Sequence, residues 1–80
     1  MWYVYFLKLS NNDIYVGFTG DLKKRVGVHN RGDVVATKPY LPAHLKSYVA
    51  VETEEIAMKL EKYFKSGSGK AIAYKRLLSN

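Results

Sequence analysis

Apolar and aromatic residues gather in three short runs that are typical of β-strands. The first two runs are residues 2–8 (WYVYFLK) and 14–18 (IYVGF), and an Asn-Asn-Asp sequence lies between them. β-Branched and aromatic side chains favour strands, whereas Asn and Asp favour tight turns. Residues 2–18 are therefore predicted to form a β-hairpin, and residues 45–51 (LKSYVAV) are predicted to form a third strand.

The segment 21–30 (DLKKRVGVHN) predicts a first helix. Thr19 or Asp21 can cap its first turn, and Gly32 can end it. The residues that follow, 31–44, contain both prolines of the chain, and we expect them to form a surface loop.

Residues 52–65 (ETEEIAMKLEKYFK) predict the longest helix. Thr53 is a suitable cap, the first turn is acidic, and apolar residues recur at helical spacing. The SGSG sequence at 66–69 is expected to end this helix, and residues 70–78 (KAIAYKRLL) predict a short basic helix. The element order is therefore ββαβαα in a single domain, residues 1–80. The predicted fold class is α/β (α+β), with a three-stranded antiparallel sheet flanked by helices.

Composition narrows the possible partners and the compartment. Thirteen Lys and Arg against seven Asp and Glu give a net charge of +6, which favours a polyanionic partner such as nucleic acid. The chain has no cysteine, which excludes disulfides and thiolate metal sites and favours the cytoplasm. Lys8 ends the first apolar run far short of the about 20 residues that span a bilayer, so we expect a soluble protein.

Several polar side chains suit the cleavage of a phosphodiester. Tyr5 and Tyr15 lie in the middle of the hairpin strands, where they can share one face, and Arg25 and His29 are four residues apart on one side of a helix. An arginine can pair with phosphate oxygens and stabilise the charge of the transition state. A phenol can act as a base if nearby cations lower its pKa, as we expect here. Taken singly, each residue also has an ordinary explanation in packing or surface solvation.

Glu61 lies in the middle of the longest predicted helix, at the border of its apolar face. A carboxylate in such a place is costly unless it is paired or bound to a metal. Magnesium can be held by one carboxylate together with phosphate oxygens of a substrate. A salt bridge to Lys62, Lys65 or Arg25 explains the position equally well.

These residues resemble the GIY-YIG nuclease superfamily over nearly the whole chain. The two half-motifs appear as Tyr3-Val4-Tyr5 and Tyr15-Val16-Gly17, and the spacings to Arg25 and His29 match the family. The segment EIAMKLEKYFKSGSGKA is similar to the family's last helix, with Glu61 in the place of its metal-binding glutamate. The chain most resembles the short stand-alone relatives of the N-terminal nuclease domain found in the excinuclease ABC system.

The resemblance implies a metal-dependent DNA endonuclease acting on single-stranded or structured DNA, in repair, recombination or DNA processing. Glu61 would bind a divalent cation, Mg²⁺ or Mn²⁺, and Arg25 would steady the scissile phosphate. Tyr5 or Tyr15 would activate the attacking water, with Tyr5 favoured, and His29 would orient the water or relay a proton. Five lysines are expected to contact the nucleic acid: Lys23, Lys24, Lys38, Lys65 and Lys70.

Two positions depart from the family pattern. Tyr3 replaces the first glycine, and Ala73 lies where some members have an active-site asparagine, for which Ser66, Ser68 or Lys70 can compensate. The alternative functions are therefore a module that binds nucleic acid without cutting it and, less favoured, a structural or adaptor protein.

Overall fold

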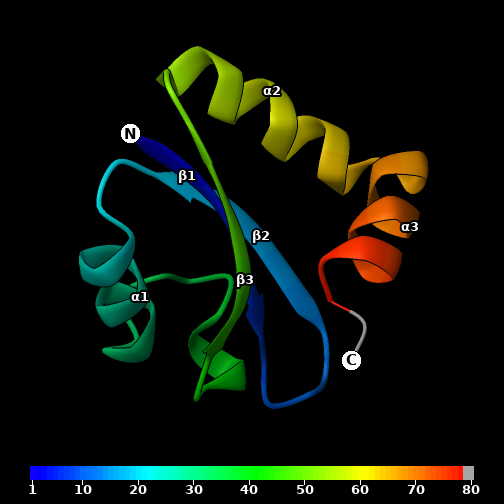
Figure 1. Ribbon diagram of the computed structural model, residues 1–80. Coiled ribbons are helices and arrows are strands. Elements are labelled where there is room, and N and C mark those ends of the chain that lie inside the picture. The colour runs from blue at the N-terminus through cyan, green and yellow to red at the C-terminus, as the bar shows by residue number, and fades with distance from the viewer. Residues whose placement is uncertain (79–80) are drawn as a thin grey trace.

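Three strands form an antiparallel sheet with the first strand in its centre (Figure 1). The computed structural model describes residues 1–78; residues 79 and 80 of the predicted domain lie outside the described residues. The strands are β1 (Trp2–Lys8), β2 (Ile14–Thr19) and β3 (His44–Val51), in the order β2-β1-β3. The predicted α+β fold, hairpin and third strand are confirmed.

The helices cover the two faces of this sheet separately. Helices α2 (Glu54–Lys65) and α3 (Gly67–Arg76) lie together on one side, and α1 (Leu22–Asn30) lies on the other (Figure 1). A short 3₁₀ helix, η1 (Lys38–Tyr40), interrupts the connection from α1 to β3. No helix within the described part of the chain is long and apolar enough to cross a membrane.

The side chains of β1 point alternately to the two faces of the sheet and so belong to two separate cores. Val4 and Phe6 point toward α2 and α3, and the ring of Phe6 contacts that of Phe64 edge to face with centroids 5.2 Å apart. Tyr5 and Leu7 point to the opposite face, where α1 and the connection to β3 cover them. Because side chains alternate between the faces of a strand, β1 is buried on both sides and fixes the register of the whole sheet.

The predicted caps of the first two helices are present. The Asp21 side chain accepts a hydrogen bond from the Lys24 backbone N–H, and Thr53 caps α2 in the same way. Helix α1 ends in a left-handed residue, Gly32, whose φ is 81°, and the N–H of Gly32 donates to the His29 carbonyl. Glycine adopts this conformation without a steric penalty, which explains the stop at this position.

The predicted break between the last two helices is too long. Only Ser66 is non-helical, whereas Gly67 and Gly69 already belong to α3, so the prediction of a helix beginning at residue 70 is wrong. The Ser66 hydroxyl accepts from the Gly69 N–H and donates to the Tyr63 carbonyl. One serine therefore ends α2 and starts α3, and Gly69 allows the two helices to meet closely.

Substitution by alanine should change the stability of the protein in opposite directions at two glycines of α3. A Cβ at Gly69 would overlap the backbone carbonyl of Tyr63, whereas a Cβ at Gly67 meets nothing within 4 Å. We expect Gly69→Ala to lower the free energy of unfolding by roughly 1–3 kcal/mol because the helices must move apart. Gly67→Ala should be neutral or stabilising by up to about 1 kcal/mol. Urea denaturation of both variants measures this, and equal stabilities would contradict the close packing described here.

Candidate active site

Three of the predicted site residues, Arg25, His29 and Tyr15, surround a fourth, Tyr5. Its hydroxyl oxygen lies 2.9 Å from Nε2 of His29, and Nε of Arg25 donates a hydrogen bond to it over 3.4 Å. The ring of Tyr15 lies beside both aromatic groups, with its centroid 5.0 Å from that of His29 and 6.4 Å from that of Tyr5. The hairpin and α1 therefore bring together two phenols, an imidazole and a guanidinium. These four residues, Tyr5, Tyr15, Arg25 and His29, are called the Tyr5 cluster below.

Gly17 allows Tyr5 to take this position. The two residues are directly opposite each other on β1 and β2, and a Cβ at Gly17 would overlap the phenol of Tyr5. The Tyr5 ring therefore crosses over the backbone of β2 to reach α1. The glycine of the second half-motif has a steric role in the site.

The buried imidazole of His29 is held on its other side by Thr37. Nδ1 of His29 lies 2.9 Å from Oγ1 of Thr37, which in turn donates to the Val34 carbonyl over 3.5 Å. A hydroxyl has one proton to donate, so Oγ1 accepts a hydrogen bond from Nδ1–H. From these partners we assign the ring proton to Nδ1, an assignment in which Nε2 is unprotonated and accepts the proton of Tyr5.

Thr37 is a contact of the candidate site that the sequence did not reveal. It lies in the segment 31–44, which was expected to be a surface loop, yet Thr37 is fully buried and Ala43 is almost fully buried. Asn30 anchors the end of this segment, because its side-chain amide exchanges two hydrogen bonds with the backbone of Ala43, of 2.9 and 2.8 Å. No local pattern marks Thr37, because its partner lies eight residues away across an irregular turn.

Burial controls the protonation of the two central groups. Burial raises the pKa of Tyr5, and this effect outweighs the hydrogen bond from Arg25, which lowers it. The expectation that nearby cations give a net lowering is therefore wrong for the protein alone. Burial, followed by the charge of Arg25, lowers the pKa of His29 and keeps it neutral at neutral pH. Hydrogen bonding to Tyr5 raises the pKa of Arg25, which stays charged.

Glu61 lies on α2, where it pairs with Lys65. Its side chain is 20% exposed, and its Oε2 atom lies 3.5 Å from Nζ of Lys65, so one of the expected salt bridges is present. The negative charge of Glu61 contributes to the raised pKa of Tyr5, which places the carboxylate within electrostatic range of the cluster. Residues 1–78 contain no group of three or more His, Cys, Asp or Glu side chains that could hold a metal. Glu61 therefore fits Mg²⁺ only as a single carboxylate ligand, with water and phosphate oxygens completing the shell.

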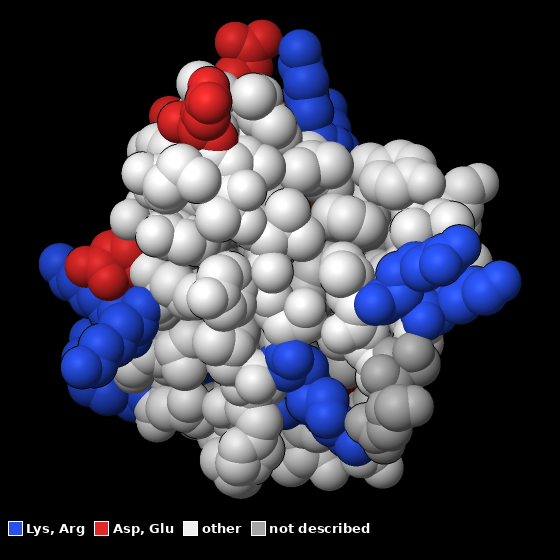
Figure 2. Space-filling view, viewed as in Figure 1, with Lys and Arg blue, Asp and Glu red and all other residues white. Residues whose placement is uncertain are grey.

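The basic side chains gather in separate groups on the surface. Figure 2 shows Lys and Arg gathered over α1 and over α3. Lys65 and Lys70 line a cavity of about 180 Å³ together with Tyr15. The other three predicted DNA contacts are exposed on α1 and η1: Lys23, Lys24 and Lys38.

The departure at Ala73 has a structural explanation. Ala73 is buried in the core between the sheet and the helices, where it packs in the same cluster as Phe64. Of the residues expected to compensate for the missing amide, Ser66 is engaged in both helix ends. Lys70 shares a cavity with Tyr15, whereas Ser68 is not among the residues that line it.

The chain matches the GIY-YIG catalytic domain over residues 1–75 and belongs to the GIY-YIG family, a family of nucleases. It is 39% identical over 64 residues to UPF0213 proteins from Streptococcus pyogenes strains Manfredo and MGAS10270, which covers 79% of this chain and 70% of each relative. Its fold is similar to the solution NMR structure of a UPF0213 protein from Bacillus halodurans, with a TM-score of 0.58 and 29% identity. That match covers 94% of this chain and 84% of the Bacillus protein. The predicted family is confirmed.

The lowered pKa of His29 predicts that the protein loses stability in mild acid. In the unfolded chain this imidazole takes up a proton near about pH 6.5, whereas the folded protein resists protonation until a lower pH. The stabilisation is complete above the unfolded pKa and is lost as the pH falls toward the folded pKa.

Urea denaturation at about pH 7.5 and about pH 5.5 measures this loss as a decrease in the free energy of unfolding. His29→Gln removes the titrating group, so its free energy of unfolding should decrease less over the same interval. An equal decrease in the wild type and in His29→Gln would show that the imidazole is not held neutral.

Proposed function

We propose that this protein is a metal-dependent endonuclease that hydrolyses phosphodiester bonds in DNA. The observation that carries the proposal is the buried hydroxyl of Tyr5, held between the neutral imidazole of His29 and the charged guanidinium of Arg25. A phenol with both a proton acceptor and a cation at its oxygen is suited to act as a general base. Membership of a nuclease family supports the same conclusion.

The proton path runs from the attacking water through Tyr5 to His29. The phenolic proton moves to Nε2 of His29, and the phenolate oxygen takes the proton of the water that attacks phosphorus. Arg25 stabilises the phenolate, and its terminal N–H groups would donate to the scissile phosphate. Tyr5 is preferred to Tyr15 as the base because its hydroxyl contacts the unprotonated nitrogen of the imidazole.

Glu61 would hold the divalent cation, Mg²⁺ or Mn²⁺, as its one protein carboxylate. When bound, such a cation neutralises phosphate charge and favours departure of the leaving oxygen. Exchange of the ion pair with Lys65 would free the carboxylate, since this pair of side chains is partly exposed.

The net charge of +6 supports DNA as the substrate. Lys23, Lys24 and Lys38 would contact phosphates on one side of the cluster, and Lys65 and Lys70 on the other. The substrate in this proposal is single-stranded or structured DNA in the cytoplasm, cut during repair, recombination or processing.

The direct test is cleavage of supercoiled plasmid and of single-stranded DNA with Mg²⁺ or Mn²⁺. We expect Glu61→Gln to lower the rate by at least about 100-fold, as chelation of the metal should for the wild type. Glu55→Gln is the matched control, because Glu55 forms an i,i+4 pair with Lys59 on the same helix but is 79% exposed. Cleavage that survives Glu61→Gln or chelation would refute the proposed activity.

A non-catalytic module that binds nucleic acid is the second candidate. The pairing of Glu61 with Lys65 and the burial of Ala73, where an active-site amide was expected, favour it. It predicts salt-dependent binding without cleavage under either metal, and equal binding by the wild type and Glu61→Gln.

A further inference from the structure

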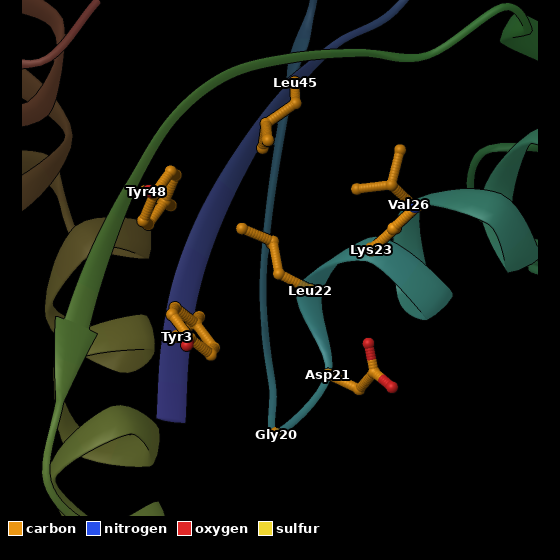
Figure 3. A pocket seen from close by; sticks show the side chains of 8 residues that line it. All are labelled: Tyr3, Gly20, Asp21, Leu22, Lys23, Val26, Leu45 and Tyr48. Carbon is orange, nitrogen blue, oxygen red and sulfur yellow. The ribbon is translucent and has the colours of Figure 1, made fainter. Parts of the chain in front are cut away.

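An apolar groove lies on the face of the sheet that α1 covers only in part. Figure 3 shows Leu22 and Val26 of α1 on one side and the side chains of Tyr3, Leu45 and Tyr48 from the strands on the other. The groove has a volume of about 540 Å³. It is separate from the Tyr5 cluster, because none of the four residues of that cluster lines it.

The aromatic wall of this groove faces solvent. The rings of Tyr3 and Tyr48 meet edge to face, with centroids 5.9 Å apart. Tyr48 is 52% exposed and Leu45 is 40% exposed, although both lie on a strand. Aromatic side chains presented in this way on a sheet are a common platform for stacking nucleic-acid bases.

The groove and the catalytic cluster share two elements. Tyr3 and Tyr5 point to the same face of β1 and are two residues apart, which is about 7 Å along a strand. Helix α1 contributes Val26 to the groove and Arg25 to the cluster. A strand of DNA whose phosphate reaches Arg25 can therefore place a neighbouring base in the groove.

The charge distribution favours a nucleic-acid strand over an apolar protein partner. The middle of the face that carries β3 is uncharged, and Lys and Arg side chains lie on either side of it and at its lower edge (Figure 2). Acidic groups are concentrated at the start of α2, with one beside α1. Lys23 and Asp21 both line the groove, and the Asp21 carboxylate is engaged there as the cap of α1, where it accepts a hydrogen bond from the Lys24 backbone N–H. A strip of apolar surface flanked by cations matches bases flanked by phosphates.

We propose that the groove formed by Tyr3, Leu45 and Tyr48 is a stacking subsite for one unpaired nucleobase of the DNA strand. This assignment rests on the proposed function for the identity of the ligand. The ring of Tyr48 stacks on the base, and Lys23 neutralises an adjoining phosphate. A base inside a duplex is already stacked and paired, so this subsite selects single-stranded or locally opened DNA.

The test measures binding without cleavage. Fluorescence anisotropy with chelator present compares a single-stranded oligonucleotide of about 12 nucleotides with a hairpin duplex of the same composition. The variants are Tyr48→Ala, which removes the ring, and Tyr48→Phe, which keeps it. Tyr63→Ala is the matched control, because Tyr63 is 43% exposed on α2, outside the groove. Circular dichroism verifies that each variant is folded.

We expect Tyr48→Ala to weaken single-strand binding by about fivefold or more and to leave duplex binding unchanged. Tyr48→Phe and Tyr63→Ala should bind the single strand like the wild type. Unchanged single-strand binding by Tyr48→Ala, or an equal loss for the duplex, would overturn the subsite. It would also be overturned if the groove proved to be the contact between two copies of the chain, seen as a dimer that Tyr48→Ala dissociates.

The subsite and the proposed activity can fail separately. Loss of single-strand affinity in Tyr48→Ala, together with no cleavage by the wild type under either metal, would leave the subsite standing and refute the nuclease. Metal-dependent cleavage by the wild type, with no effect of Tyr48→Ala on single-strand binding, would support the nuclease and refute the subsite.

Discussion

The hydroxyl of Tyr5 and the imidazole of His29 are joined by a buried hydrogen bond of 2.9 Å, and this contact connects the centre of the sheet to α1. Both side chains are almost completely removed from solvent. Each polar atom therefore needs a partner, since an unsatisfied buried group costs about 1–3 kcal/mol. Arg25 and Thr37 provide the remaining partners, so the position of α1 and of the loop after it depends on this one contact.

The same constraint explains features that lie on other elements. Gly17 is needed because the Tyr5 ring crosses over β2, and Asn30 is needed because the loop that carries Thr37 must return to the sheet at Ala43. Glu61 lies on a helix packed on the other face of the sheet, and its charge contributes to the raised pKa of Tyr5. The site therefore draws on both layers of helices, and β1 joins them because it is buried on both faces.

The elements of the fold could be predicted because their signals are local. The β-branched and aromatic run of residues 2–8 and the caps at Asp21 and Thr53 depend only on neighbours in the chain, and the structure confirms them. The short break at Ser66 could not be predicted, because it depends on how closely α2 and α3 meet.

In the candidate site, too, features set by local spacing could be predicted, and features set by contacts between distant segments could not. Spacing placed Arg25 and His29 on one side of a helix and Tyr5 and Tyr15 on one face of the hairpin, and the family resemblance implied that the two sets meet. Thr37 was missed because its contact crosses an irregular turn, and the direction of the pKa shift of Tyr5 was wrong because burial exceeds the effect of the neighbouring cation. Neither property can be read from spacing alone.

The most direct test of the proposed proton path is the tautomer of His29, measured by ¹⁵N NMR of the imidazole at neutral pH. We predict a neutral ring with the proton on Nδ1, hydrogen-bonded to Thr37, and an unprotonated Nε2 that accepts from Tyr5. A proton on Nε2, or a charged imidazolium, would contradict this path, because Tyr5 would then have no acceptor for its proton.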